Sequence, residues 1–162
     1  EAYAHYAKVA AVSEADYSST GMMISACLAL GDEQGAMRAA RMTLERVEKV
    51  VAQDRSAGGA MAYGVGALAL LGQAEQAKEW IVRALMIDAD NLLMRYNFAC
   101  ALAVHLKDAE AALEQLTPVL EGGPARLIHA ARTDPDLDPV RGDPRFAVML
   151  AKAEARLAKT AG

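Results

Sequence analysis

The stretch LLGQAEQAKEWIVRAL, residues 70–85, decides the fold. Gly72 interrupts an apolar run, and Ala77 follows that glycine by five residues. Apolar side chains then recur four and eight residues after Ala77, at Ile81 and Leu85. This spacing places the three side chains on one face of a helix. The stretch therefore predicts a tight turn followed by an amphipathic helix.

Two other stretches repeat this pattern: LALGDEQGAMRAARMTL from residue 28 and HLKDAEAALEQLTPVL from residue 105. Gly31 and Lys107 stand at the turn position, and an apolar stretch of helical character precedes each turn. The unit is thus helix, turn, helix, and such pairs stack because one pair cannot bury its apolar face alone. In the first unit, we expect the second helix to run from Asp32 to about Asp54. In the third unit, the register of the first helix stays open by one residue.

Composition agrees with helices. Hydrophobic residues make up 54% of the 162 residues, but aromatic residues only 5%, so alanine and leucine dominate, and alanine is the best helix former. We expect an all-α single domain, in which a C-terminal cap contains Asp134 and Asp143 as helix-capping residues before prolines. We expect His129 to pack or to form a hydrogen bond inside this cap, and a final helix over about 143–159. The expected parts are the end of a truncated preceding pair (1–16), three helix pairs (17–57, 58–90 and 91–123) and the cap (124–162).

The turn, the alanine five residues later and the apolar ladder resemble the tetratricopeptide repeat, over about residues 17–121. The resemblance implies a right-handed α–α superhelix, whose concave groove is lined by the first helix of each pair and binds a peptide or a protein domain. Tyr96 matches an aromatic position of the family, whereas Lys107 departs from its turn glycine. Transferred by aligning the turns, the groove residues would be Ala62, Gly66, Met94, Asn97, Ala101 and His105.

The last seventy or so residues, including LIHA (127–130), DPDLDP (134–139) and RGDPRF (141–146), resemble the end of tetratricopeptide arrays in bacterial signalling proteins. These arrays follow a class III adenylyl or guanylyl cyclase domain and a TolB-like segment. The resemblance implies a fragment of such a protein. We therefore expect a non-catalytic interaction module; the alternative is an intramolecular regulatory or dimerisation domain of a cyclase-type enzyme. A homodimer stays open.

Net charge, hydropathy and cysteine content indicate which classes of partner and which compartment to expect. The formal net charge is −4 with no dense basic run, which argues against nucleic acid. No apolar run reaches the roughly 18–20 residues of a membrane span, so we expect no direct membrane contact. Two separated cysteines, Cys27 and Cys100, are interpreted as buried free thiols in a reducing, cytoplasmic compartment, and a structural disulfide between them is the alternative.

No pattern of catalytic, metal or cofactor residues stands out. Asp134, Asp136 and Asp138 alternate like the start of a calcium loop, but a proline and an arginine replace the glycine and glutamate that such a loop needs. The three histidines share no metal-ligand spacing with each other or with the cysteines. We expect neither enzymatic activity nor a cofactor or metal.

Overall fold

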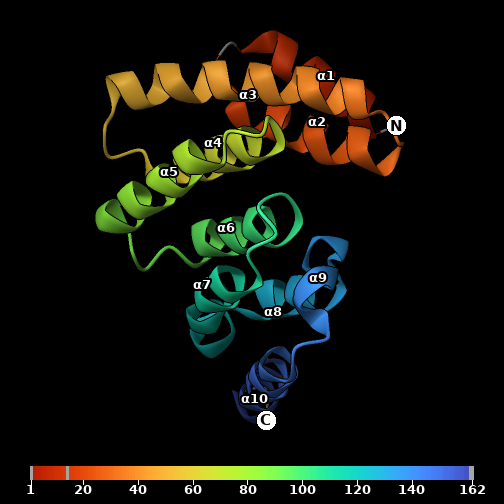
Figure 1. The fold of residues 1–162 in the computed structure, drawn as a ribbon, viewed down its shortest axis with the longest axis vertical. Helices are drawn as coiled ribbons and strands as arrows, with labels where there is room; N and C mark the ends of the chain where they lie inside the picture. The colour runs from red at the N-terminus through yellow and green to blue at the C-terminus, as the bar shows by residue number, and fades with distance from the viewer. Residues whose placement is uncertain (1, 14, 161–162) are drawn as a thin grey trace. The chain divides into compact units, whose positions relative to one another are not determined.

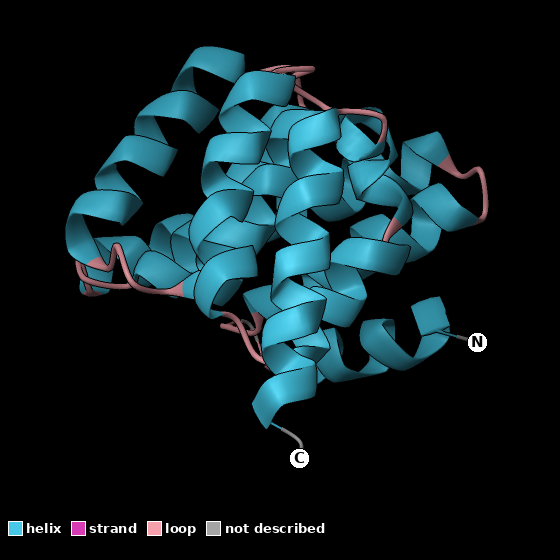
Figure 2. Cartoon of the chain, turned by 90° about the horizontal axis from the view of Figure 1, so that it is seen from below, coloured by secondary structure: helices cyan, strands magenta, loops and turns pink. Residues whose placement is uncertain are grey.

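The computed structural model describes residues 2–13 and 15–160, which fold into helices joined by short turns (Figure 1). No strand occurs in these described residues (Figure 2), so the prediction of an all-α fold is confirmed. The chain divides into two compact units, Glu1–Ala89 and Asp90–Gly162. The division falls next to the expected boundary between the second and third helix pairs.

In the described residues of the first unit, 2–13 and 15–89, α2 pairs with α3 and α4 pairs with α5. Helix α1 packs against α2, and α3 also packs against α4. Asp16 and Asp32 cap α2 and α3, because their carboxylates accept hydrogen bonds from the free N–H groups of Ser19 and Gly35. The helices are α1 (Ala2–Val12), α2 (Tyr17–Ala29), α3 (Glu33–Gln53), α4 (Gly58–Leu70) and α5 (Ala74–Ile87).

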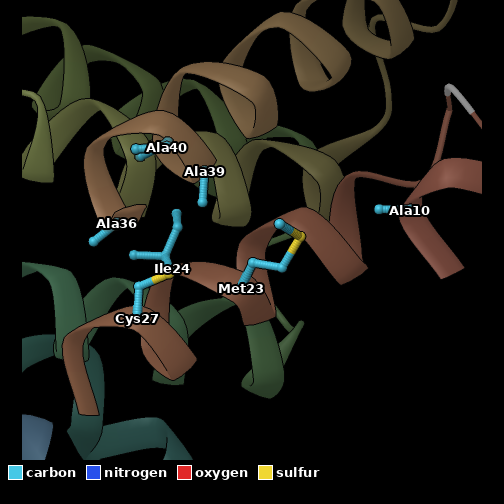
Figure 3. Packing of buried hydrophobic residues seen from close by; sticks show 8 residues of the cluster. Ala10, Met23, Ile24, Cys27, Ala36, Ala39 and Ala40 are labelled. Atoms are coloured by element: carbon cyan, nitrogen blue, oxygen red, sulfur yellow. The ribbon is translucent and has the colours of Figure 1, made fainter. Parts of the chain in front are cut away.

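Small side chains build the core between α2 and α3. Figure 3 shows Ile24 and Cys27 of α2 beside the alanines of α3. Ala36 and Ala40 are fully buried, because their spacing puts both on the face of α3 that meets α2. Alanine side chains let the two helix axes approach closely, so this core needs few large residues.

An arginine fastens the N-terminal helix to this core. Arg46 of α3 donates hydrogen bonds to the carbonyl oxygens of Ala10, Ser13 and Asp16 at distances of 2.9–3.0 Å. Carbonyl groups at the end of a helix lack partners within the helix. The guanidinium group donates the missing hydrogen bonds, and its positive charge interacts favourably with the negative, C-terminal end of the helix dipole.

The second unit consists of α6 (Leu92–Val104), α7 (Ala109–Gly122), α8 (Ala125–Thr133), a 3₁₀ turn η1 (Pro135–Leu137), α9 (Asp138–Arg141) and α10 (Pro144–Thr160). Helices α6 and α7 form the third pair, and α10 packs against α7 and α8 with Phe146 and Ala153 buried. Asp134 and Asp143 accept hydrogen bonds from backbone N–H groups, as expected for capping residues. His129 is not packed inside the cap, because its side chain is exposed on α8, but its ring nitrogen Nδ1 forms a hydrogen bond with Arg132 on the same helix.

The three turns confirm the internal repeat. Gly31, Gly72 and Lys107 are the described residues with positive φ, at 71°, 77° and 52°. The alanine that follows each turn by five residues is fully buried, with 0% exposure at Ala36, Ala77 and Ala112. The same turn chemistry and the same buried position therefore occur three times.

The third helix pair, α6 and α7, contains one extra residue, which lies in the turn after its first helix. Helices α2, α4 and α6 all have 13 residues. One residue separates the helix end from the positive-φ residue in the first two pairs, whereas His105 and Leu106 both precede Lys107. Helix α3 ends at Gln53 as expected, and Glu45 pairs with Lys49 at 2.8 Å.

Candidate recognition surface

The first helices of the three pairs, α2, α4 and α6, expose the same positions. Counted from the first residue after the N-cap, these are the second, sixth, ninth and thirteenth residues of each helix. This spacing follows one face of a helix. We call these positions the first-helix stripes: Ser18, Met22, Ser25 and Ala29 in α2; Gly59, Tyr63, Gly66 and Leu70 in α4; Leu93, Asn97, Cys100 and Val104 in α6. Every stripe residue is exposed or half-buried.

The stripes remain accessible because the other faces of these helices are used for packing. In α2, Met23, Ile24 and Cys27 are buried in the core with α3. In α4, Val65 and Leu68 are fully buried. The stripe residues are therefore less buried than the side chains that form the core on the other faces of α2 and α4.

In the first unit, the stripes of α2 and α4 lie on two helices that pack against each other. A side chain on Gly21 would collide with the ring of Tyr63, so the missing side chain lets Tyr63 lie on α2. The Tyr63 ring also meets the Tyr17 ring, with centroids 5.5 Å apart. Partial burial raises the pKa of the Tyr63 hydroxyl above its ordinary value.

Two glycines of α4 have opposite surroundings. A methyl group on Gly64 would collide with the Trp80 ring and approach Val47, so Gly64 serves close packing between helices. A methyl group on Gly66 would meet nothing within 4 Å. Gly66 therefore marks an open place in the stripe, where a ligand can approach the backbone of α4.

The C-terminal segment covers part of the α6 stripe in the second unit. Turn η1 packs on α6, and the hydroxyl of Tyr96 donates a 2.6 Å hydrogen bond to Oδ2 of Asp134. Burial raises the pKa of Tyr96, and the nearby Cys100 and Asp134 raise it further. Leu93 stays exposed at 42%, whereas Cys100 is covered in part by this segment. The open part of the stripe is thus its N-terminal half.

Cys100, Asp134 and Asp136 bring three potential metal-ligand atoms within 4.8 Å of one another. Burial, followed by the neighbouring carboxylates, raises the pKa values of the Cys100 thiol and the Asp136 carboxyl. Metal binding requires both groups to be deprotonated, which these shifts oppose. Asp134 already accepts hydrogen bonds from the Tyr96 hydroxyl and the Asp136 amide. The group is therefore better suited to fastening η1 onto α6 than to holding an ion.

The six residues expected to line a groove fall into two sets, Ala62 and Gly66 on α4, and the other four on α6 or its C-cap. Gly66 and Asn97 belong to the stripes. His105 is the C-cap of α6, and its partial burial lowers its pKa. The remaining three side chains are at most 4% exposed and face the packed side of their helices: Ala62, Met94 and Ala101.

The register explains which residues sequence reasoning missed. Aligning the turns shifts the positions of the third helix pair by one residue relative to the first two pairs, because the extra residue lies between α6 and Lys107. Alignment from the helix starts avoids this shift, and the N-caps Asp16 and Asn91 were visible signals for it. This alignment would have pointed to Leu93 and Cys100 of α6 in place of the buried Met94 and Ala101.

No protein-family model matches this sequence, and no curated protein matches it either. Among the described residues, no helix combines the length and the apolar character needed to cross a membrane. Both cysteines are free thiols, with Cys27 buried and Cys100 half-buried.

Proposed function

We propose that this chain is a non-catalytic protein-interaction module that binds a peptide or a helix of a partner protein on its first-helix stripes. The observation that carries this proposal is that three helices of equal length expose the same four positions. In this proposal the helix pairs belong to a right-handed superhelix of the tetratricopeptide type. Free thiols support a reducing, cytoplasmic location.

The chemistry of the stripes in the first unit supports a ligand that is largely uncharged. Met22 is 40% exposed, Leu70 is half-buried, and Ser25 and Tyr63 carry hydroxyls, whereas the Ser18 hydroxyl donates a hydrogen bond to Asp16. No Asp, Glu, Lys or Arg occupies a stripe position on α2 or α4. We therefore infer that α2 and α4 recognise small apolar side chains together with backbone polar groups of the ligand. Such contacts are typical of peptide grooves in helical repeat proteins.

Selection from a displayed peptide library, with the whole chain as bait, tests this proposal. Substitution of Ser25→Lys or Gly66→Lys places a long charged side chain on the stripe without disturbing the core. We expect either substitution to weaken binding of the selected peptides by about tenfold or more, as at the centre of an interface. Isothermal titration measures the affinities, and circular dichroism checks that each variant folds.

Ala52→Lys is the matched control, because Ala52 is exposed on α3 outside the stripes. The control should bind the selected peptides as the original chain does. Peptides that bind all three variants equally well would contradict the proposed surface. If the library gives no binder, peptide recognition fails and regulation of an attached cyclase-type domain becomes the better hypothesis.

A further inference from the structure

Helix α1 stands in the position of a second helix within a pair. Four residues join it to α2, just as four residues join α3 to α4 and α5 to α6. It packs against the first helix that follows it, α2, as α3 packs against α4. The other second helices, α3, α5 and α7, also pack against the first helix that precedes them. Among the described residues, α1 has no such helix before it.

The absence of this contact leaves one face of α1 open. Helix α5 packs against α4, the first helix of its own pair, and buries Ala77, Ile81 and Ala84. Counted back from the four-residue connections, the equivalent positions of α1 are Ala2, Tyr6 and Val9. Ala84 is fully buried, whereas Val9 is 40% exposed. Val9 therefore lies where a first helix would pack, and we call this side of α1 the open face.

Leu30 at the end of α2 lacks a contact of the same kind. Leu71, the C-cap of α4, packs against the core between α2 and α3. Leu30 is the C-cap of α2 and precedes its turn glycine in the same way, but it is 75% exposed. By this equivalence, a helix paired with α1 would complete the core that Leu30 needs. Both exposed side chains thus indicate one position for an added helix.

The aromatic rings of α1 limit what can pack on the open face. In the second pair, Trp80 of α5 lies against Gly64 of α4. The equivalent of Trp80 in α1 is His5, whose ring meets the Tyr6 ring with centroids 5.5 Å apart. A helix that packs here needs a small residue opposite these rings. Helix α1 of a second copy fits poorly, because antiparallel contact would bring the rings and Lys8 of both copies to its centre.

We propose that the open face of α1 binds an amphipathic helix of a partner protein, which takes the place relative to α1 that α4 takes relative to α5. The partner helix offers apolar side chains to Val9 and a small residue to the rings of His5 and Tyr6. Lys8 borders the face and makes no ion pair within the described part of the chain, so a carboxylate at the edge of the partner helix would complement it. The contact uses none of the first-helix stripe residues.

Selection from a displayed library of amphipathic helices of about 18 residues, long enough to form helix in isolation, tests the proposal with the whole chain as bait. We expect selected helices to combine an apolar face, a Gly, Ala or Ser within it and an acidic edge. Val9→Lys should raise their dissociation constants about tenfold or more, as at the centre of an interface. Val12→Lys, at an exposed position one turn further along, should weaken binding less. Isothermal titration measures both effects, and circular dichroism checks that each variant folds.

Ala11→Lys is the matched control, because Ala11 is exposed on the opposite side of α1. It should bind the selected helices as the original chain does, and so should the stripe variant Ser25→Lys, which separates this contact from the first-helix stripes. A library without binders would overturn the proposal, as would helices that bind Val9→Lys and Ala11→Lys equally well. Self-association of the original chain that Val9→Lys abolishes, measured by sedimentation equilibrium, would also overturn it and assign the open face to a second copy.

Discussion

Helices α4 and α6 have the same length and the same role in their helix pairs, but they are held in place by different means. Helix α4 is held by close packing at a position without a side chain: Gly64 lets Trp80 lie against the backbone of α4. Its N-cap residue, Ala57, makes no side-chain hydrogen bond. Helix α6 uses polar groups: Asn91 caps it, and Tyr96 bonds to Asp134 of the following segment. The difference shows that one scaffold accepts either close packing or specific hydrogen bonds.

This difference has a consequence for recognition. Close packing through Gly64 occupies the inner face of α4 and leaves Gly66 open. The hydrogen bond of Tyr96 draws η1 onto α6, next to Cys100 of its stripe. We therefore expect the stripes of the first unit to bind a ligand better than the stripe of the second unit does. Four predictions test this comparison.

The largest effect is expected at the packing glycine of α4. Gly64→Ala forces Trp80 and Val47 to move, which should lower the free energy of unfolding by about 1–3 kcal/mol, the usual range for overpacking. Gly66→Ala is the matched control on the same helix. It meets no neighbour and removes backbone freedom from the unfolded chain, so it should stabilise the protein by about 0.5–1 kcal/mol. Urea denaturation measures both, and a similar loss at the two positions would contradict the assigned roles.

The next effect is expected at the polar contact of α6. Tyr96→Phe removes the hydrogen bond to Asp134 and leaves a partly buried carboxylate oxygen without that donor, which should cost about 1–3 kcal/mol. Labelling of Cys100 by a thiol reagent, in a Cys27→Ser background, should also accelerate as η1 loosens. Tyr3→Phe is the control, because Tyr3 is 40% exposed on α1. Unchanged labelling would show that the hydroxyl does not hold η1 on α6.

A smaller effect is expected at the turns. Lys107 adopts a φ of 52°, a left-handed conformation that costs a residue with a side chain about 1 kcal/mol. Lys107→Gly should therefore stabilise the protein by up to about 1 kcal/mol, less the entropy that glycine loses on folding. Gly72→Ala should destabilise by about as much. Thermal unfolding measures both shifts, and shifts of the same sign would contradict a shared turn geometry.

The smallest effect is expected from pH at Asp136. Burial, followed by Asp134 and Asp138, raises the pKa of this carboxyl in the folded protein above its unfolded value. The folded state thus binds the proton more tightly, so this group lowers stability as pH rises through the raised pKa. Asp136→Asn should stabilise the protein at pH 7, and the gain should shrink toward the ordinary carboxyl pKa. Denaturant unfolding at both pH values, with exposed Asp90→Asn as control, measures this gain.

Local patterns in the sequence determined much of the fold. The turns at Gly31, Gly72 and Lys107 and the buried alanines after them could be predicted, because a left-handed turn and a helical apolar period are properties of neighbouring residues. The same is true of the end of α3 and of the capping role of Asp134. Each depends on side chains and backbone groups only a few residues apart.

Tertiary structure alone decided which side chains on these helices are accessible. Ala62 and Gly66 are both small residues of α4, yet one is 3% exposed and the other faces open space. Tyr96 and Asp134, 38 residues apart, meet only because η1 folds back onto α6. Periodicity indicates the apolar face of a helix, but contacts distant in sequence determine what covers the remaining faces, and a single sequence does not reveal such contacts.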